Sequence, residues 1–196
     1  MTLAPVWQPP LQQRVYRVLL EAHSFPGRVI DLPDELRDQP ATLAVLATLL
    51  DVSTSFCDAD GLISPEDQLR LDAPSASADE ADFVLFQADL APPVGFTPRL
   101  GDVYQPHEGA TLVLYGPSIV EGEACFELSG PGIAATRRLS LSGCDTAWFA
   151  RRETWVSAYP TGVDLILCDA SRVAAIPRTT AMRRLPGGAA SDRGLV

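Results

Sequence analysis

An acidic residue interrupts an otherwise apolar stretch near the C-terminus, where an unpaired charge would be costly. Asp164 stands within the apolar run 163–167. A carboxylate that enters a protein core needs a cationic or hydrogen-bonding partner, because water no longer stabilises its charge. Arg17 and Arg178 are the candidate partners of Asp164. The pattern favours a structural salt bridge over a catalytic role.

Two other patterns could support catalysis or ligand binding. His107 and Glu108 could form an acid–base pair, but adjacent side chains rarely point the same way, so a surface position is favoured. Gly130 and Gly132 flank a proline and could hold a phosphate, yet a tight turn between strands explains them better. No Ser/His/Asp set is evident. We therefore predict no catalytic, cofactor-binding or metal-binding residue in this chain.

The basic residues are unusual, since all 15 are arginine and the chain has no lysine. This excludes a pyridoxal-phosphate Schiff base and a Walker P-loop, because both require lysine. A net charge of −10 argues against general nucleic-acid binding, which depends on neutralising phosphates. Adjacent arginines could contact an anionic substrate or an acidic partner, or could simply be solvated; these pairs are 137–138, 151–152 and 183–184.

The four cysteines show no metal-binding spacing. No two of them form a C-x-x-C pair, and only His23 and His107 could join them as nitrogen ligands. We interpret them as small buried apolar residues. They are Cys57, Cys125, Cys144 and Cys168.

The length of 196 residues suits one domain. We predict that this domain covers residues 1–184 and that residues 185–196 form a disordered tail. No apolar run approaches the length that spans a bilayer, and the N-terminus lacks the features of a signal peptide. We therefore expect a cytoplasmic protein that does not bind membranes.

Helices are expected early and late in the chain, with strands between them. The predicted helices are one with an apolar face at Val15, Val18, Leu19 and Ala22, one over 41–50, one from the Ser64 cap to about Leu71, and one around 148–156 with Asp145 as cap. The predicted strands cover 28–32, 53–56, 83–86, 111–115 and 124–128. This order predicts an α/β fold, a single-domain sandwich around one mixed sheet.

A hairpin is the strongest local pattern. The apolar runs 163–167 and 173–176 are joined by a short polar link. Pro177 has no N–H to donate and should end the second strand. Arg178, Thr179 and Thr180 then follow at the edge of the sheet.

Four motifs occur in order between about residues 12 and 182. They are Tyr16-Arg17-Val18-Leu19-Leu20 with Ala22, Ser24 and Pro26-Gly27; the segment 106–112; the segment 128–133; and Tyr159-Pro160 with 162–166 and 175–180. Together they resemble the PhnH subunit of the bacterial carbon–phosphorus lyase system. The sequence departs from that family at His23, where methionine is common, and at 71–73, which replaces a Phe-His-Thr-like stretch.

The resemblance implies an accessory subunit of a multi-subunit complex with PhnG, PhnI, PhnJ and PhnL-like partners. In that system the ribose triphosphate of ATP is transferred to an alkylphosphonate and adenine is released, with PhnI thought to carry the catalysis. The implied fold is similar to pyridoxal-phosphate-dependent transferases without the cofactor, and the family forms homodimers. The candidate structural or interface residues are Arg17, Asp164, Arg178 and Thr179.

Two alternatives remain open. A stand-alone acid–base enzyme would use His107, Glu108 and Asp164. A binding protein would instead grip a phosphonate or a nucleotide with its arginines.

Overall fold

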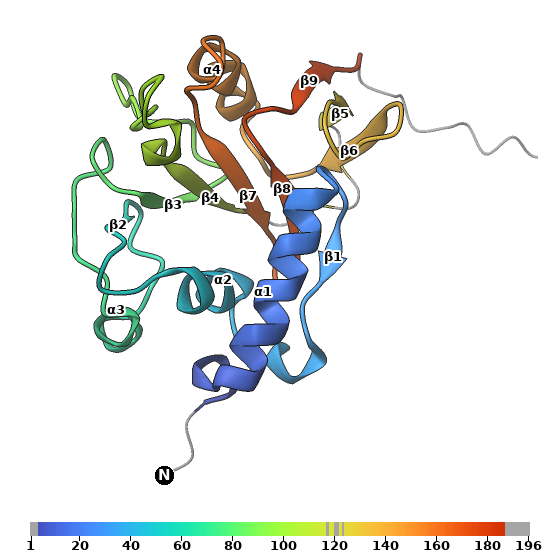
Figure 1. The fold of residues 1–196 in the computed structure, drawn as a ribbon. Helices are drawn as coiled ribbons and strands as arrows, with labels where there is room; N and C mark the ends of the chain where they lie inside the picture. Colours follow the sequence, from blue (N-terminus) through green and yellow to red (C-terminus); the bar gives the residue numbers. More distant parts are fainter. Residues whose placement is uncertain (1–3, 117, 120–121, 123, 187–196) are drawn as a thin grey trace, which may run out of the picture.

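The computed structural model describes residues 4–116, 118–119, 122 and 124–186, which form an α/β fold (Figure 1). The α-helices of this part are α1 (Pro9–Ser24), α2 (Ala41–Leu49), α3 (Pro65–Leu71) and α4 (Ala147–Trp155). The 3-10 helices are η1 (Pro5–Trp7), η2 (Asp34–Leu36) and η3 (Pro106–Glu108). The strands are β1 (Ile30–Asp31), β2 (Phe56–Asp58), β3 (Phe83–Gln87), β4 (Thr111–Tyr115), β5 (Ala124–Ser129), β6 (Arg137–Leu141), β7 (Asp164–Cys168), β8 (Arg172–Ile176) and β9 (Ala181–Arg184).

The larger sheet is mixed and has the strand order β1-β8-β7-β4-β3-β2. Strands β2, β3, β4 and β7 run parallel, while β8 is antiparallel to both β7 and β1. The first residues of the parallel strands lie in register in one row: Phe56, Phe83, Thr111 and Asp164. Side chains just before these strands are therefore brought together at the amino edge of the sheet.

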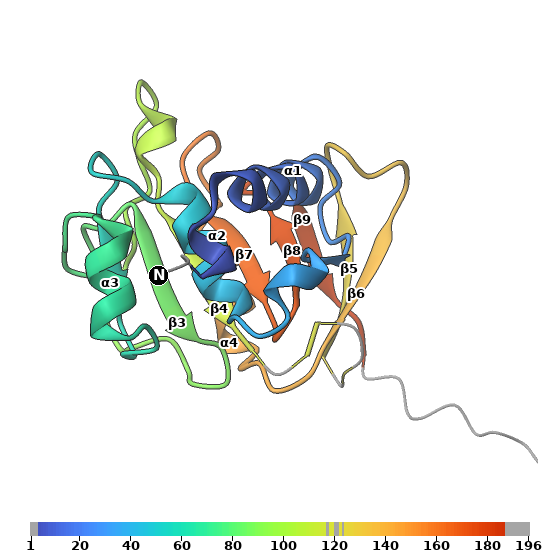
Figure 2. The same ribbon diagram turned by 90° about the horizontal axis from the view of Figure 1, so that it is seen from below.

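The large sheet is buried on both faces, because successive strand residues point to opposite sides. Leu85, Val113 and Ile166 lie side by side and pack in the cluster that includes residues of α1 and α2. Their neighbours Leu112 and Leu165 belong to the other cluster, with residues of α4 and of β5 and β6. Figures 1 and 2 show α1 and α2 on one side of this sheet and α4 on the other.

A second, antiparallel sheet of order β6-β5-β9 corrects the expectation of a single sheet. Sequence patterns missed β6 and β9 because arginines occupy half or nearly half of their positions, which hides any apolar alternation. The hairpin of β7 and β8 is confirmed, and β8 ends at Ile176, directly before Pro177. The turn after Pro177 carries the chain from the large sheet into the small one.

Two strand predictions need correction. The strand expected at 53–56 starts only at Phe56, because the Asp51 carboxylate accepts hydrogen bonds from the backbone and hydroxyl of Ser53 and so forms a turn. The strand expected at 28–32 is reduced to β1.

The helix predictions agree closely with the structure. Ser64 caps α3 through its hydroxyl, which accepts from the N–H of Asp67. The Asp145 carboxylate accepts from the N–H of Ala147 at the start of α4. The predicted tail at 185–196 falls mostly outside the described residues, although the N–H of Leu185 still donates to Cys125.

Candidate functional site

Asp164 and Arg178 form the centre of the polar contacts at the amino edge of the large sheet. The Asp164 carboxylate accepts the backbone N–H of Arg178 at 2.7 Å and its Nη2–H at 2.6 Å. The side chains are only 23% and 14% exposed. Of the two candidate partners for Asp164, the structure therefore supplies Arg178. Arg178, which we expected at the edge of the sheet, is half-buried.

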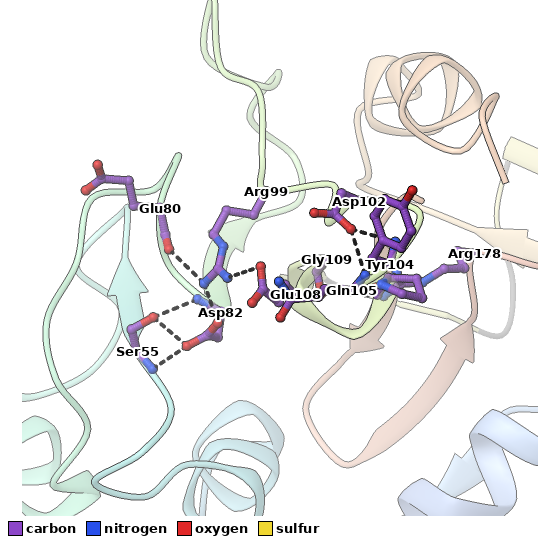
Figure 3. Close-up of polar contacts among 11 residues, drawn as sticks. Ser55, Glu80, Asp82, Arg99, Asp102, Tyr104, Gln105, Glu108, Gly109 and Arg178 are labelled. Atoms are coloured by element: carbon purple, nitrogen blue, oxygen red, sulfur yellow. Dashed lines mark hydrogen bonds and ion pairs between the residues drawn. The ribbon is translucent and has the colours of Figure 1, made fainter. Parts of the chain in front are cut away.

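The same guanidinium also reaches a loop more than 65 residues earlier in the sequence. Arg178 donates from Nη1 to the carbonyl of Pro106 and from Nη2 to the carbonyl of Gly109 at 3.4 Å. Gly109 has no room for a side chain, because a Cβ there would lie 2.2 Å from the Gly162 carbonyl oxygen and 2.6 Å from Arg178. Arg178 thus ties the segment around η3 to Asp164 at the start of β7. Figure 3 shows Arg178 beside this segment.

A second arginine, Arg99, contacts the same loop at Glu108. Arg99 donates to the Asp82 carboxylate at 2.6 Å, and its Nη2 lies 3.7 Å from Glu108. Asp82 in turn accepts from the backbone N–H and the hydroxyl of Ser55. Burial alone would raise the pKa of Asp82, but the hydrogen bonds from Ser55 and the contact with Arg99 outweigh it, so the pKa is lowered. Asp82 is therefore ionised at neutral pH. Figure 3 shows its contacts with Ser55 and Arg99.

The 100–109 loop between these two arginines has an ordered backbone and an exposed tip. Leu100 and Gly109 form an antiparallel bridge at its base. At the tip, Asp102 accepts the backbone N–H groups of Tyr104 and Gln105 at 2.6 and 2.7 Å. Tyr104 itself is 93% exposed. Figure 2 shows the segment, in yellow-green, standing away from the body of the molecule.

The geometry does not assemble His107 and Glu108 as an acid–base pair. His107 is exposed, and Glu108 faces Arg99. Asp164, the third residue of that alternative, is held by Arg178. Within the described ranges, the structure shows no hydrogen bond between His107 and either carboxylate.

Sequence analysis missed Arg152, which sits on α4 and is 1% exposed. Its Nη2 donates to the carbonyls of Pro177 at 2.6 Å and Thr180 at 3.1 Å. Burial lowers the pKa of the Arg152 guanidinium to about 10, although the charge of Asp164 opposes this shift. Helical spacing placed Arg152 on the same face as Trp148 and Trp155, which was a signal of its burial, but its contacts with the 177–180 turn depend on tertiary packing.

Glycines bring the remaining motifs against the same turn. A Cβ on Gly130 would lie 2.9 Å from the carbonyl oxygen of Thr179, and one on Gly132 would lie 2.2 Å from that of Ser24. The N–H of Gly27 donates to Ala175 in β8. Gly130 and Gly132 therefore serve as a close-packed turn, as predicted. The four motif segments therefore contact one another around β8 and the 177–180 turn that follows it.

The other two candidate residues lie at the surface. Thr179 is exposed within the turn. Arg17 is exposed on α1 and lines a cavity of about 400 Å³ with Asp31 and Asp34. Within the part of the chain that the structure describes, Arg17 forms no hydrogen bond or ion pair with Asp164, and a role for it at an interface stays a prediction.

Three of the four cysteines are poor nucleophiles and poor metal ligands. Cys168 is buried and the other three are half-buried. Burial raises the pKa of the Cys57 and Cys168 thiols and raises that of Cys144 to about 12, so these thiols stay protonated. Within the described part of the chain, no group of three His, Cys, Asp or Glu residues could hold a metal ion.

Among the helices that the structure describes, none has the length and apolar character of a membrane span.

Comparisons with known proteins agree with the motif pattern. Residues 6–183 match the family model of the bacterial phosphonate metabolism protein PhnH. The putative C-P lyase subunit protein HtxG of Stutzerimonas stutzeri is 42% identical over 175 residues, which cover 89% of this chain and 87% of the relative. The matched range contains every residue of the 100–109 loop and of the 177–180 turn.

Proposed function

Because this chain belongs to the PhnH family of bacterial phosphonate metabolism proteins, we propose that it is an accessory subunit of a carbon–phosphorus lyase. In this role it works with PhnG, PhnI and PhnL-like subunits to transfer the ribose triphosphate of ATP to an alkylphosphonate. With methylphosphonate as substrate the product would be α-D-ribose 1-methylphosphonate 5-triphosphate, with adenine released, and PhnJ would act within the same complex. The proposal also takes the isolated chain to be a cytoplasmic homodimer.

One observation carries the accessory role: the charged side chains where the motif segments meet form hydrogen bonds with main-chain groups. Arg178 and Arg152 donate to main-chain carbonyls, and Asp164 accepts a main-chain N–H. What this framework presents outward is the tip of the 100–109 loop, with Val103 70% and Tyr104 93% exposed. An aromatic side chain on a pre-organised loop suits a protein interface, because little conformational entropy is lost on docking. We propose that this tip contacts a partner subunit.

A relation to pyridoxal-phosphate-dependent transferases without the cofactor is part of the same proposal. The α/β fold with a mixed sheet is compatible with it. The lack of any lysine supports a lineage that does not form the Schiff base.

The test is co-expression of the tagged chain with the other lyase subunits of the same host. The wild-type chain should retain its partners on affinity purification and should restore growth on methylphosphonate in a strain that lacks it. Tyr104→Ser should weaken retention about tenfold or more. Leu69→Ser is the matched control, because Leu69 is also 82% exposed but lies on α3.

The outcomes separate the hypotheses. A wild-type chain that retains no partner contradicts the accessory role, and equal retention by Tyr104→Ser contradicts the docking role of the loop. Turnover by the isolated chain that is lost in His107→Ala would favour the stand-alone enzyme. Heat of binding with ATP or methylphosphonate in calorimetry would favour the small-molecule binder.

A further inference from the structure

A second loop with an exposed tyrosine lies beside the 100–109 loop at the amino edge of the large sheet. It is the segment 156–163, which leads from α4 into β7. The N–H of Gly162 in this segment donates to the carbonyl of Leu100 at 2.8 Å. Tyr159 of the same segment is 72% exposed. Two loops that are hydrogen-bonded to each other therefore each expose an aromatic side chain, and one partner can contact both.

Acidic residues outnumber basic ones around these loops. The turn before β3 and the 100–109 loop carry five acids, namely Asp79, Glu80, Asp82, Asp102 and Glu108. Arg99 is the arginine among them. Its guanidinium contacts the carboxylates of Asp82 and Glu108 and donates to the backbone carbonyl of Glu80 at 3.4 Å (Figure 3). Five acids and one arginine give this set a formal net charge of −4.

Three of the five acids form no ion pair with any residue that the structure describes, and all three are exposed. The Glu80 carboxylate accepts the hydroxyl of Ser77, and the Asp102 carboxylate accepts backbone N–H groups at the loop tip. Asp79 likewise accepts a backbone N–H. These donors are uncharged, so the negative charge of the three carboxylates is available to a partner.

The neighbouring arginines do not offset this charge. Arg178 is only 14% exposed and forms its ion pair with Asp164. Arg151 of α4 is half-buried and donates to two backbone carbonyls, and the exposed Glu153 on the same helix balances it. Within the described residues of the two loops, His107 is the one group that can become positively charged, and it would offset only one of the four negative charges.

The combination of exposed tyrosines and surrounding acids selects the chemistry of the partner. Exposed aromatic side chains favour an apolar depression, because burying a tyrosine ring removes a large apolar area from water. The acids favour basic side chains around that depression and speed the encounter through long-range attraction. Two copies of this surface facing each other would oppose like charges, which disfavours a second copy as the occupant.

We propose that the two loops dock together on a partner subunit, in an apolar depression with a basic rim. Tyr104 and Tyr159 enter the depression, and arginine or lysine side chains of the rim pair with Glu80 and Asp102. The inference rests on the proposed function, since it requires that the chain assembles with partner subunits.

The first test measures binding kinetics between the purified chain and the co-purified partner subunits of the same host. A charge at the rim of an interface acts mainly on the association rate, so Glu80→Lys should slow association about threefold to tenfold at low salt and less than about twofold near 0.5 M salt. Glu66→Lys is the matched control, because Glu66 is 75% exposed but lies on α3. It makes the same change in net charge and should alter the rate by less than about twofold.

The second test asks whether both loops take part in the contact. Hydroxyl-radical footprinting of the wild-type complex should show Tyr104 and Tyr159 protected relative to the isolated chain, and this readout needs no substitution. Tyr159→Ser should weaken partner retention about fivefold or more. Tyr16→Ser is its control, because Tyr16 is 52% exposed but lies on α1, and it should change retention by less than about twofold. The unfolding temperature of each variant checks that it is folded.

The outcomes that overturn the proposal differ from those that overturn the proposed function. Unchanged reactivity of Tyr159 in a complex that holds the chain, or equal retention by folded Tyr159→Ser, excludes the second loop from the contact. Equal association rates of the wild-type chain and Glu80→Lys at low salt exclude the basic rim. A dimer of the isolated chain that Tyr159→Ser converts to a monomer assigns the surface to self-association. A wild-type chain that retains no partner instead contradicts the proposed function itself.

Discussion

Arg178→Met is expected to lower the free energy of unfolding by about 3 kcal/mol, because it leaves a mostly buried carboxylate without its cation. Asp164 loses the Nη2–H donor at 2.6 Å and keeps only the backbone N–H. A hydrogen bond to a charged group contributes about 1.5–3 kcal/mol, and the orphaned Pro106 carbonyl costs about 1 kcal/mol more. Water reaches the pair, because the two side chains are 23% and 14% exposed. The lower part of the range of about 1.5–3 kcal/mol therefore applies to the lost hydrogen bond.

The measurement is urea denaturation followed by tryptophan fluorescence, with the midpoint and slope fitted separately. For a chain of this size, 3 kcal/mol corresponds to a fall in unfolding temperature of roughly 6–12 °C. Arg37→Met is the matched control, because the Arg37–Asp34 pair is 73% and 80% exposed. It should change stability by less than about 0.5 kcal/mol.

A double-mutant cycle tests the cause. Asp164→Asn with Arg178→Met should be less destabilising than the sum of the single changes, by about 1.5–2 kcal/mol, because no unpaired charge remains. A loss below about 1 kcal/mol in Arg178→Met, or additive effects in the cycle, would refute a structural role for the pair.

Three further predictions concern the surrounding contacts. Arg152→Met should cost about 2–4 kcal/mol in urea denaturation, because the carbonyls of Pro177 and Thr180 lose their donor; an effect within about 0.5 kcal/mol would contradict this. Gly132→Ala should cost at least about 3 kcal/mol, since it combines a φ of +81° with a 2.2 Å approach to a backbone oxygen. Gly61→Ala, with a φ of +68° and open space, should cost only about 1–2 kcal/mol, and equal losses would argue against the close approach. Because the pKa of Asp82 is lowered in the folded chain, its carboxylate contributes its full stabilisation above the ordinary Asp pKa of about 3.9. This contribution is lost as the pH falls below that value. Asp82→Asn should reduce the loss of unfolding free energy at low pH, measured by urea denaturation at several pH values. An unchanged loss would show that Asp82 does not cause it.

Much of the fold follows from local patterns. The helical spacing of Val15, Leu19 and Ala22 identified the buried face of α1, and Ser64 identified the start of α3. The hairpin of β7 and β8 was predicted from two apolar runs and a proline. Patterns failed where polar residues form strands, as in β9, because pairing with β5 decides that conformation rather than intrinsic preference.

The candidate site was predicted only in part. Asp164 was identified because a charge inside an apolar strand requires a partner, and Arg178 was one of two possibilities. Arg152 shares a helical face with Trp148 and Trp155, which set it apart, but the sequence did not show what it contacts. The sequence offered no basis for selecting Arg99 or Asp82, since both resemble the many other charged residues of the chain. Their roles depend on the positions of backbone carbonyls and strand ends that are distant in the sequence.

The sequence by itself determined the α/β class, the lack of lysine chemistry and the family of this chain, because composition and ordered motifs are local properties. Tertiary structure alone decided that the four motifs contact one another around β8 and the turn after it, that Arg178 rather than Arg17 pairs with Asp164, and that β9 is an edge strand of the small sheet. The physical reason is that burial and hydrogen bonding depend on which segments pack together. The spacing of residues along the chain does not contain that information.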